Sequence, residues 1–348
     1  MANLKDVARL AEVDPSTVSR VLRGDPSQAV RPETRERIVE AARSLRYRPN
    51  ALARGLRTRR TDTIGLVMPD IGNLGFAEVT HGIQTAAAQA GRLVLLIEAS
   101  SLGDDGDHTL DTEHKYEQLI GDGRVDGLIV AFATLDDRLV AHLAERKIPL
   151  VLVNRRTAGV HGSVVVDDER GSRLAIQHLF ALGHARIGLV GLAAETDTAR
   201  RREQGYRTAM DQAGIRVEPG WTVAGPASIA GGHAAVEPIL GQPASVRPTA
   251  LFVASLLGAV GVLGRLRAAG LRVPDDISVI AFNDHELAEH LDPPLTTIRM
   301  PNLRMGQEAV RMLVSALDGA PAGDVMIDEE PHIVVRRSTA PPPSAGVR

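Results

Sequence analysis

The sequence of 348 residues contains no cysteine, which excludes disulfide bridges and metal sites built on thiolates. It also lacks a basic-then-apolar export signal and any apolar run long enough to cross a bilayer. We therefore expect a cytoplasmic protein without a membrane partner. A leucine heptad is missing near the C-terminus, which argues against a coiled-coil tetramerisation tail.

Motifs for catalysis and for metal or cofactor binding are missing too. His285 and His290 are five residues apart, about 140° around a helix, whereas a zinc-protease helix needs a spacing of four. The glycines of residues 258–264 lack the spacing of a dinucleotide-binding loop, and residues 104–108 do not fit a calcium loop. We therefore expect no enzyme, no metal and no cofactor.

The chain has the composition of a soluble globular protein, with 44% hydrophobic and 24% charged residues. Its charge is unevenly distributed. The first sixty residues hold fourteen Lys and Arg against seven Asp and Glu, a net charge of +7, although the whole chain carries −3. A basic N-terminal module on an acidic body is suited to phosphate contact by one end only.

Two short helices joined by a tight turn are predicted at the N-terminus. Leu4, Val7, Ala8 and Ala11 have helical spacing, and Asp14 can cap a second helix that runs to Leu22. This arrangement is typical of a helix-turn-helix, whose second helix enters the major groove by its N-terminal end. Pro15, Ser16 and Thr17 stand at that end, with Arg20 one turn later.

A third helix is predicted from about Pro32 to Leu45. Its apolar residues would close a three-helix core with Val7, Val18 and Val21; they are Ile38, Ala41, Ala42 and Leu45. The segment that follows, from Asn50 to Leu56, can be capped by Asn50, but it is too short to be a stable helix alone and too basic to be buried. We expect a hinge helix there.

Three separate runs of residues, 17–22, 47–56 and 64–67, resemble the lactose-repressor family of bacterial transcription regulators in order and spacing. The resemblance continues to residues 294–298. Arg31 departs from it, because the family usually has a small capping residue there. The resemblance implies that operator DNA is bound by Lys5, Pro15, Ser16, Thr17, Ser19, Arg20, Asn50, Ala53, Arg54, Leu56 and Arg57.

From Thr63 onward, short apolar strands alternate with helices, which predicts parallel sheets with helices on both faces. The strands are too many for one compact sheet, so we expect two α/β subdomains with a cleft between them, where ligands would bind at the carboxyl ends of the strands. The expected strands are 64–68, 93–97, 127–131, 150–153, 163–166, 186–190, 250–254 and 277–282, and the helices include 76–90, 136–146, 168–182 and 256–269.

The resemblance implies a body like periplasmic sugar-binding proteins, with two Rossmann-like subdomains. The chain would cross between them near Val166 and near Pro293. The expected domains are a helix-turn-helix domain (1–48), a hinge helix and linker (49–60), an effector-binding and dimerisation body (61–340) and a disordered tail (341–348). Within the body we expect an N-subdomain of 61–166 and 293–322 and a C-subdomain of 167–292 and 323–340.

The resemblance also implies five effector-binding residues: Phe76, Asn154, Arg202, Ser255 and Asn283. Four of them have a plainer alternative. Phe76 is equally well explained as core, Arg202 as one of a solvated trio with Arg200 and Arg201, and the two asparagines as turn residues at strand ends. Ser255 and Leu256 replace an Asn-Asp pair usual in the family, so a smaller or less polyhydroxylated effector is expected, or a weakly bound one.

We therefore expect a homodimeric repressor that binds a near-palindromic operator and responds to a sugar-like or other small metabolite. Within the same fold, a co-repressor-dependent or activating regulator is the alternative. A solute-binding transport protein would need an export signal and would have no use for residues 1–60. An enzyme is disfavoured because no catalytic constellation is present.

Overall fold

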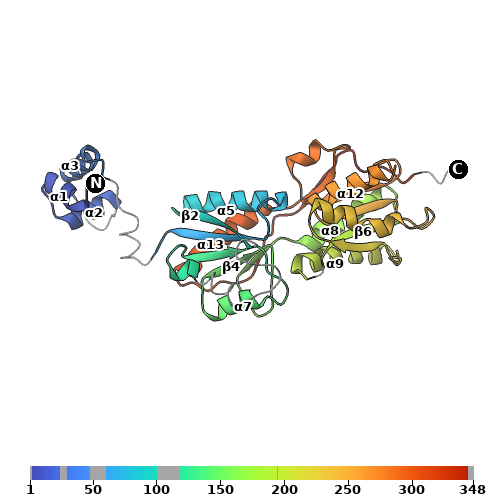
Figure 1. The fold of residues 1–348 in the computed structure, drawn as a ribbon, viewed down its shortest axis with the longest axis horizontal. Coiled ribbons are helices and arrows are strands. Elements are labelled where there is room, and N and C mark those ends of the chain that lie inside the picture. The colour runs from blue at the N-terminus through green and yellow to red at the C-terminus, as the bar shows by residue number, and fades with distance from the viewer. Residues whose placement is uncertain are drawn as a thin grey trace. The chain divides into compact units, whose positions relative to one another are not determined.

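The computed structural model describes residues 2–23, 30–47, 60–99, 116, 118–193 and 195–343. It divides into two compact units, Met1–Thr61 and Asp62–Arg348. We call the first the headpiece and the second the body. The predicted α-helical headpiece and α/β body are both confirmed (Figure 1).

The headpiece contains three helices, α1 (Leu4–Leu10), α2 (Pro15–Arg23) and α3 (Pro32–Ser44). The predicted core is present: Val7, Val18 and Ile38 are fully buried, and Val21, Ala41 and Ala42 pack with them. Arg31 precedes α3 and makes no side-chain capping hydrogen bond. This is the weaker cap that the departure from the family pattern predicted.

The body contains two six-stranded sheets. The N-sheet has the order β11-β5-β4-β3-β1-β2, and all its neighbouring strands are parallel. These strands are β1 (Thr63–Met68), β2 (Leu93–Glu98), β3 (Gly127–Val130), β4 (Leu150–Val153), β5 (Ser163–Val165) and β11 (Val325–Met326).

Alternate residues of the N-sheet pack on opposite faces, as a strand's twofold repeat requires. Ile64 and Leu66 belong to the core beneath α5 (Ala77–Gln89) and α13 (Asn302–Leu317). Val67 belongs to the core beneath α7 (Arg138–Glu145), on the other face (Figure 1). A short 3-10 helix, η1 (Leu74–Phe76), leads into α5.

The C-sheet has the order β12-β10-β9-β8-β6-β7 and is parallel except for β12, which runs antiparallel to β10. Helices α8 and α9 pack together on one face, and α10 and α12 on the other. The strands are β6 (Ile187–Leu192), β7 (Thr222–Gly225), β8 (Ala250–Val253), β9 (Ser278–Phe282), β10 (Thr296–Arg299) and β12 (His332–Val334). The helices are α8 (Asp168–Ala181), α9 (Asp197–Gln212), α10 (Ile229–Ala235), α11 (Glu237–Leu240), α12 (Leu256–Ala268) and η3 (Glu286–Glu289).

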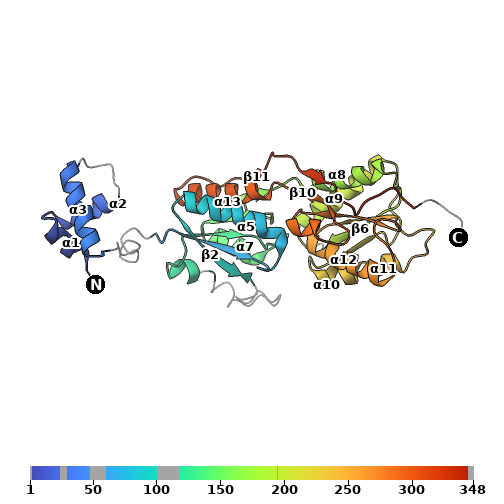
Figure 2. The same ribbon diagram turned by 90° about the horizontal axis from the view of Figure 1, so that it is seen from above.

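The described body crosses between the sheets after β5, after β10 and after β11. The first crossing lies at Val166, as expected. The second was misplaced, because β10 pairs with β9, so the chain leaves the C-subdomain near Met300 and not near Pro293. The third was also misplaced: β11 still belongs to the N-sheet, so residues 323–326 were wrongly assigned to the C-subdomain. Figure 2 shows the crossing segments between the two halves of the body.

Helices α5 and α13 approach each other closely through two glycines. A Cβ atom added to Gly82 would lie 2.2 Å from the carbonyl oxygen of Leu303, and one added to Gly306 would lie 2.2 Å from that of Val79. Any side chain at either position would therefore push the helices apart. No helix in the described parts of the chain is both long and apolar enough to cross a membrane.

Candidate DNA-contacting and effector sites

Asp14 fixes the start of α2, as the sequence predicted. Its Oδ1 accepts a hydrogen bond of 2.7 Å from the backbone N–H of Ser16, and its carbonyl oxygen accepts one of 2.9 Å from that of Thr17. Side-chain and backbone hydrogen bonds from Ser16 hold the pKa of Asp14 below its ordinary value. A carboxylate here also complements the positive end of the helix dipole.

The orientation of α2 follows from which residues it buries. Val18 and Val21 face the core of the headpiece, while Ser16 is exposed and Pro15, Thr17, Ser19 and Arg20 are half-buried. Lys5, on α1, is exposed. The N-terminal end of α2 therefore offers small polar side chains to the outside, as a helix that contacts base edges requires. The other expected DNA contacts, Asn50, Ala53, Arg54, Leu56 and Arg57, lie outside the described residues.

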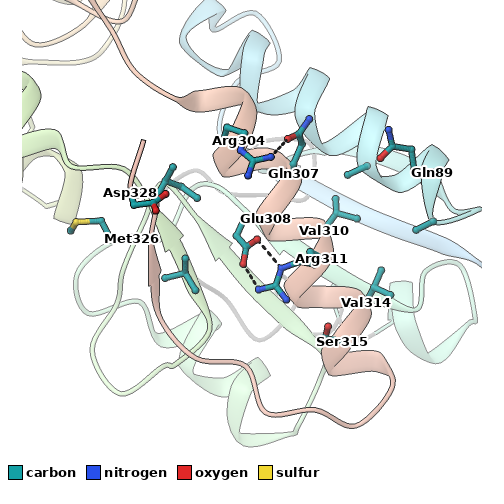
Figure 3. A pocket seen from close by; sticks show the side chains of 14 residues that line it. Gln89, Arg304, Gln307, Glu308, Val310, Arg311, Val314, Ser315, Met326 and Asp328 are labelled. Atoms are coloured by element: carbon teal, nitrogen blue, oxygen red, sulfur yellow. Dashed lines mark hydrogen bonds and ion pairs between the residues drawn. The ribbon is translucent and has the colours of Figure 1, made fainter. Parts of the chain in front are cut away.

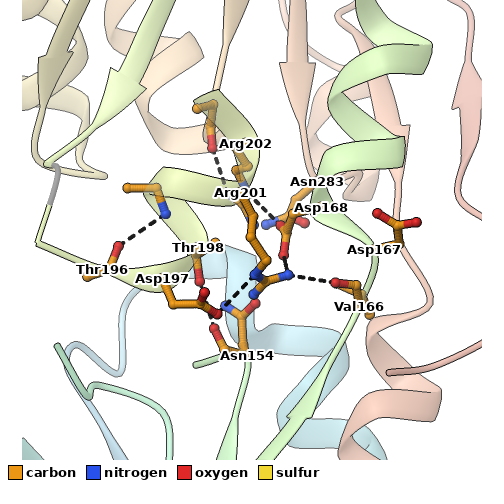
Figure 4. A network of polar contacts seen from close by, with 12 residues as sticks. Asn154, Val166, Asp167, Asp168, Thr196, Asp197, Thr198, Arg201, Arg202 and Asn283 are labelled. Carbon is orange, nitrogen blue, oxygen red and sulfur yellow. Dashed lines mark hydrogen bonds and ion pairs between the residues drawn. The ribbon is translucent and has the colours of Figure 1, made fainter. Parts of the chain in front are cut away.

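A buried polar network lies where the two subdomains meet, and we call it the arginine cluster (Figure 4). At its centre is Asp168, which is the first residue of α8. The carboxylate of Asp168 is fully buried. It accepts hydrogen bonds from Arg201 and from Nε of Arg202, the latter at 2.7 Å. The cluster consists of Arg155, Asp168, Asp197, Arg201 and Arg202.

Arg202 is 5% exposed, which excludes the solvated alternative for it. Its Nη1 donates 2.6 Å to the carbonyl oxygen of Ala254, and its guanidinium lies 3.9 Å from the ring centre of Phe282. Burial lowers the pKa of Arg202 despite the carboxylate of Asp168 beside it. Arg202 thus lies where β8 and β9 end and is held in one orientation by these contacts.

Arg201 is 7% exposed, so the alternative of a solvated trio fails for it as well; Arg200 is the exposed member of the three. Figure 4 shows Arg201 reaching from α9 toward Asp168 and Val166. Its Nη1 donates 2.7 Å to the carbonyl oxygen of Val166, and its Nε donates 2.9 Å to Asp197. Arg201 therefore joins the start of α9 to the crossing segment after β5.

Arg155 and Thr198 link the two subdomains directly. Nη1 of Arg155 donates to Thr198 and, at 2.9 Å, to the carbonyl oxygen of Asn154; the hydroxyl of Thr198 donates 2.7 Å to the same carbonyl oxygen. Asn154 directly follows β4 of the N-sheet, whereas Thr198 lies in the first turn of α9 in the C-subdomain. A change in the angle between the subdomains must therefore alter these bonds.

Three of the other expected effector residues, Asn154, Ser255 and Asn283, follow the ends of β4, β8 and β9, whereas Phe76 ends η1. Asn154 and Asn283 both have the left-handed backbone that asparagine tolerates, with φ of 58° and 70°. Oδ1 of Asn283 accepts a hydrogen bond of 3.3 Å from Asn302, across the two subdomains. Ser255 caps α12 by accepting a bond of 3.1 Å from Gly258. Phe76 is 6% exposed and belongs to the hydrophobic core.

A separate groove of ≈ 910 Å³ lies on the outer side of the N-subdomain, between α5, α13 and β11 (Figure 3). It combines apolar residues such as Val310 and Met326 with an ion pair of Glu308 and Arg311. Its lining includes no residue at the carboxyl ends of β1, β3, β4 or β5, where ligands of such folds bind. Within the described residues, no group of three metal-ligating side chains is present.

Sequence reasoning did not nominate Arg155, Asp168, Asp197, Thr198 and Arg201 for the effector site. One signal was available: Asp197 and Arg201 are four residues apart on one helix, the spacing of an ion pair. The partners of Arg155 and Asp168 come from distant parts of the chain, so no local pattern indicated them.

Two family models match the chain. One, described as bacterial regulatory proteins of the lacI family, matches residues 3–50, and one described as a periplasmic binding protein-like domain matches residues 176–339. The HTH-type transcriptional repressor PurR of Aliivibrio fischeri is 33% identical over 340 residues, which cover 97% of this chain and 98% of that protein.

Solved structures agree with these matches. A Lac repressor dimer bound to operator and the anti-inducer ONPF is 27% identical, with a TM-score of 0.81 and coverage of 97% of this chain and 99% of that one. A complex of the transcriptional regulator CelR with cellobiose is 31% identical, with a TM-score of 0.71 and coverage of 97% and 100%. With its helix-turn-helix and its two α/β subdomains, the chain belongs to the LacI family of DNA-binding transcription regulators, a family without enzymatic activity.

Proposed function

We propose that the protein is a repressor that binds a near-palindromic operator as a homodimer and releases it when a small effector binds between the subdomains. The observation that carries the proposal is the α2 end fixed by Asp14, which presents Ser16 and Thr17. A two-fold dimer would place two such ends on the two halves of a two-fold site.

The arginine cluster and the asparagines at the strand ends support an effector site at the junction of the subdomains. Polar groups from both subdomains converge there, and Thr198 bonds both Asn154 and Arg155 across the junction. A ligand that binds one subdomain angle better than another shifts the equilibrium between them. We expect this shift to bias residues 49–60 between helix and coil and so to control DNA binding.

The exposed edge of the N-sheet supports the homodimer. β2 is the last strand of that sheet, and three of its leucines are exposed: Leu93 to 72% and Leu95 and Leu96 to 39% each. Adjacent exposed leucines on an edge strand are unusual in a monomer and typical of an interface.

The test begins by selecting the operator from random DNA with the full-length protein. Replacing Ser16 and Thr17 with alanine should weaken operator binding about tenfold or more but leave binding to random DNA nearly unchanged, since base contacts carry specificity and phosphate contacts do not. The control is Arg35→Gln, an exposed residue of α3 outside the proposed contacts. Equal losses on both DNAs would show that α2 does not read the sequence.

Binding to the same operator, measured with and without a ligand, shows whether the ligand induces or co-represses. A ligand found by thermal shift should lower operator affinity if the protein is an inducible repressor. A ligand that raises the affinity would instead establish the co-repressor alternative.

A further inference from the structure

The arginine cluster contains more positive than negative charge. Three guanidinium groups, those of Arg155, Arg201 and Arg202, stand against the two carboxylates of Asp168 and Asp197. Asp168 pairs with Arg201 and Arg202, and Asp197 pairs with Arg201. In the described part of the chain, Arg155 has no carboxylate partner; it donates only to Asn154 and Thr198.

Two nitrogen atoms of the cluster are buried without a hydrogen-bond partner in the described structure, Nε of Arg155 and Nη2 of Arg201. A buried donor without a hydrogen-bond partner destabilises the folded protein, because it has lost its hydrogen bonds to water. Burial and the charges of Arg202 and Arg201 lower the pKa of Arg155 to about 10, although Asp168 and Asp197 oppose the shift. The guanidinium of Arg155 is thus both desolvated and repelled by its neighbours.

A neighbouring carboxylate does not offset this excess. Asp167 immediately precedes α8, and its Oδ1 accepts a hydrogen bond of 2.8 Å from the backbone N–H of Arg170. Figure 4 shows its side chain turned away from Arg201. Asp167 therefore caps the helix and does not pair with an arginine of the cluster.

We propose that the effector carries an anionic group, a carboxylate or a phosphate, which binds Arg155 and Arg201. This rests on the proposed effector site at the junction of the subdomains. An anion there would accept hydrogen bonds from the two unsatisfied nitrogens and balance the excess charge. Guanidinium groups bind both kinds of anion through charge-assisted hydrogen bonds. Because Arg155 also bonds Thr198, the anion would act on a contact between the subdomains.

Arg155 would then lower the stability of the unliganded protein and raise the stability of the liganded one. Removing its charge should therefore have opposite effects in the two states. In Arg155→Met, the melting temperature without ligand should be unchanged or higher than in the wild type. The stabilisation by an anion should be lost.

The test uses full-length protein, with melting temperatures measured in inorganic phosphate and in acetate against chloride at equal ionic strength. Matched neutral and anionic ligands follow by calorimetry: glucose, glucose 6-phosphate and gluconate, then ribose and ribose 5-phosphate. We expect only anionic members to bind, with the phosphate and acetate arms showing which anion is preferred. Arg155→Met and Arg201→Gln should each weaken that binding at least tenfold.

Arg200→Gln, on the exposed side of the same helix, is the matched control and should bind as the wild type does. Equal anion-induced shifts in the wild type and in Arg155→Met would overturn the proposal. So would a neutral ligand whose affinity is unchanged in both variants, and this result would leave the proposed regulator function intact. If the wild type selected no operator from random DNA, in contrast, the proposed regulator function itself would be overturned.

Discussion

Two fully buried carboxylates, Asp168 and Asp284, each bind two arginines in the C-subdomain. Asp168 pairs with Arg201 and Arg202, and Asp284 lies 2.5 Å from Nη2 of Arg299 and 2.7 Å from Nη1 of Arg336. A buried charge is tolerated only when it is paired and hydrogen-bonded, so each carboxylate fixes its arginines in place. Asp284 in this way joins β9, β10 and the segment after β12.

Replacing Asp284 with asparagine should destabilise the body by about 3 kcal/mol at pH 7, because Arg299 and Arg336 lose their carboxylate. Urea denaturation measures this loss. Asp275→Asn is the control, because Asp275 forms an exposed pair with Arg272 that contributes little. A loss for Asp284→Asn as small as that of the control would show that the pair does not stabilise the fold.

The same substitution should change how stability depends on pH. Burial alone would raise the pKa of Asp284, but hydrogen bonds from Arg336 and Thr297, with the charges of Arg336 and Arg299, outweigh it and lower the pKa. An acid with a lowered pKa stabilises the fold above its unfolded pKa of about 3.9, and that stability is lost as the pH falls through the folded value. The wild type should therefore lose more stability than Asp284→Asn below about pH 4.

At this scale, the sequence predicted residues with a local signal and missed those without one. The capping of α2 by Asp14 can be predicted from residues within three positions of it, and so can the missing side-chain cap at Arg31. The pairing of Asp168 with Arg202 joins residues 34 positions apart, so it depends on how α8 packs against α9. The position of Arg202 was indicated by family resemblance and not by its chemistry.

Among the elements, the packing of α5 against α13 gives a sharp prediction. Gly82→Ala should destabilise the body by about 1–3 kcal/mol, because the new methyl group would meet the carbonyl oxygen of Leu303. Gly264→Ala in α12 is the control: nothing lies within 4 Å of the added Cβ atom, and alanine should stabilise that helix by up to about 1 kcal/mol. Chemical denaturation of both variants tests this, and equal effects would contradict the close helix contact.

The hinge segment carries a prediction that lies outside the described residues. We expect Leu56 to insert into the minor groove at the operator centre, which unstacks a base step and kinks the duplex. Leu56→Ala should then weaken operator binding and reduce the bend, but hardly change binding to random DNA, since Arg54 and Arg57 are retained.

Affinities for both DNAs at one salt concentration, with fluorescence transfer across the site, measure these effects. An unchanged bend, or equal losses on both DNAs, would indicate that Leu56 instead anchors the linker on the body.

Strands with strong apolar runs were predicted well, whereas the short strands β7, β10, β11 and β12 were not. The eight expected strands all occur, with ends shifted by at most two residues. The strands β10, β11 and β12 contain only two to four residues, and β10 and β12 also include polar side chains such as Thr296 and His332. Their sheet membership depends on neighbouring strands, which explains why two crossings were misplaced.

For the whole molecule, we predict a dimer held by the body and not by the headpiece. Leu93→Glu should convert it to a monomer at micromolar concentration, because a charge would replace an exposed leucine at the proposed interface. Val246→Glu, at a residue 47% exposed in the C-subdomain, should remain dimeric. Light scattering tests both. A dimeric Leu93→Glu would exclude the β2 edge from the interface, and a monomeric wild type would refute the homodimer.

The crossings between the subdomains have a consequence for synthesis on the ribosome. The headpiece helices are complete by residue 44, whereas the N-sheet lacks α13 and β11 until residues 302–326 have been made. Until then, the apolar face of the sheet that α13 covers, which includes Ile129 and Val151, stays exposed to solvent. A nascent chain therefore carries a finished DNA-binding module long before it carries a finished sensor. We expect chaperones and proteases to remove a truncated chain before it can bind an operator without regulation by the effector.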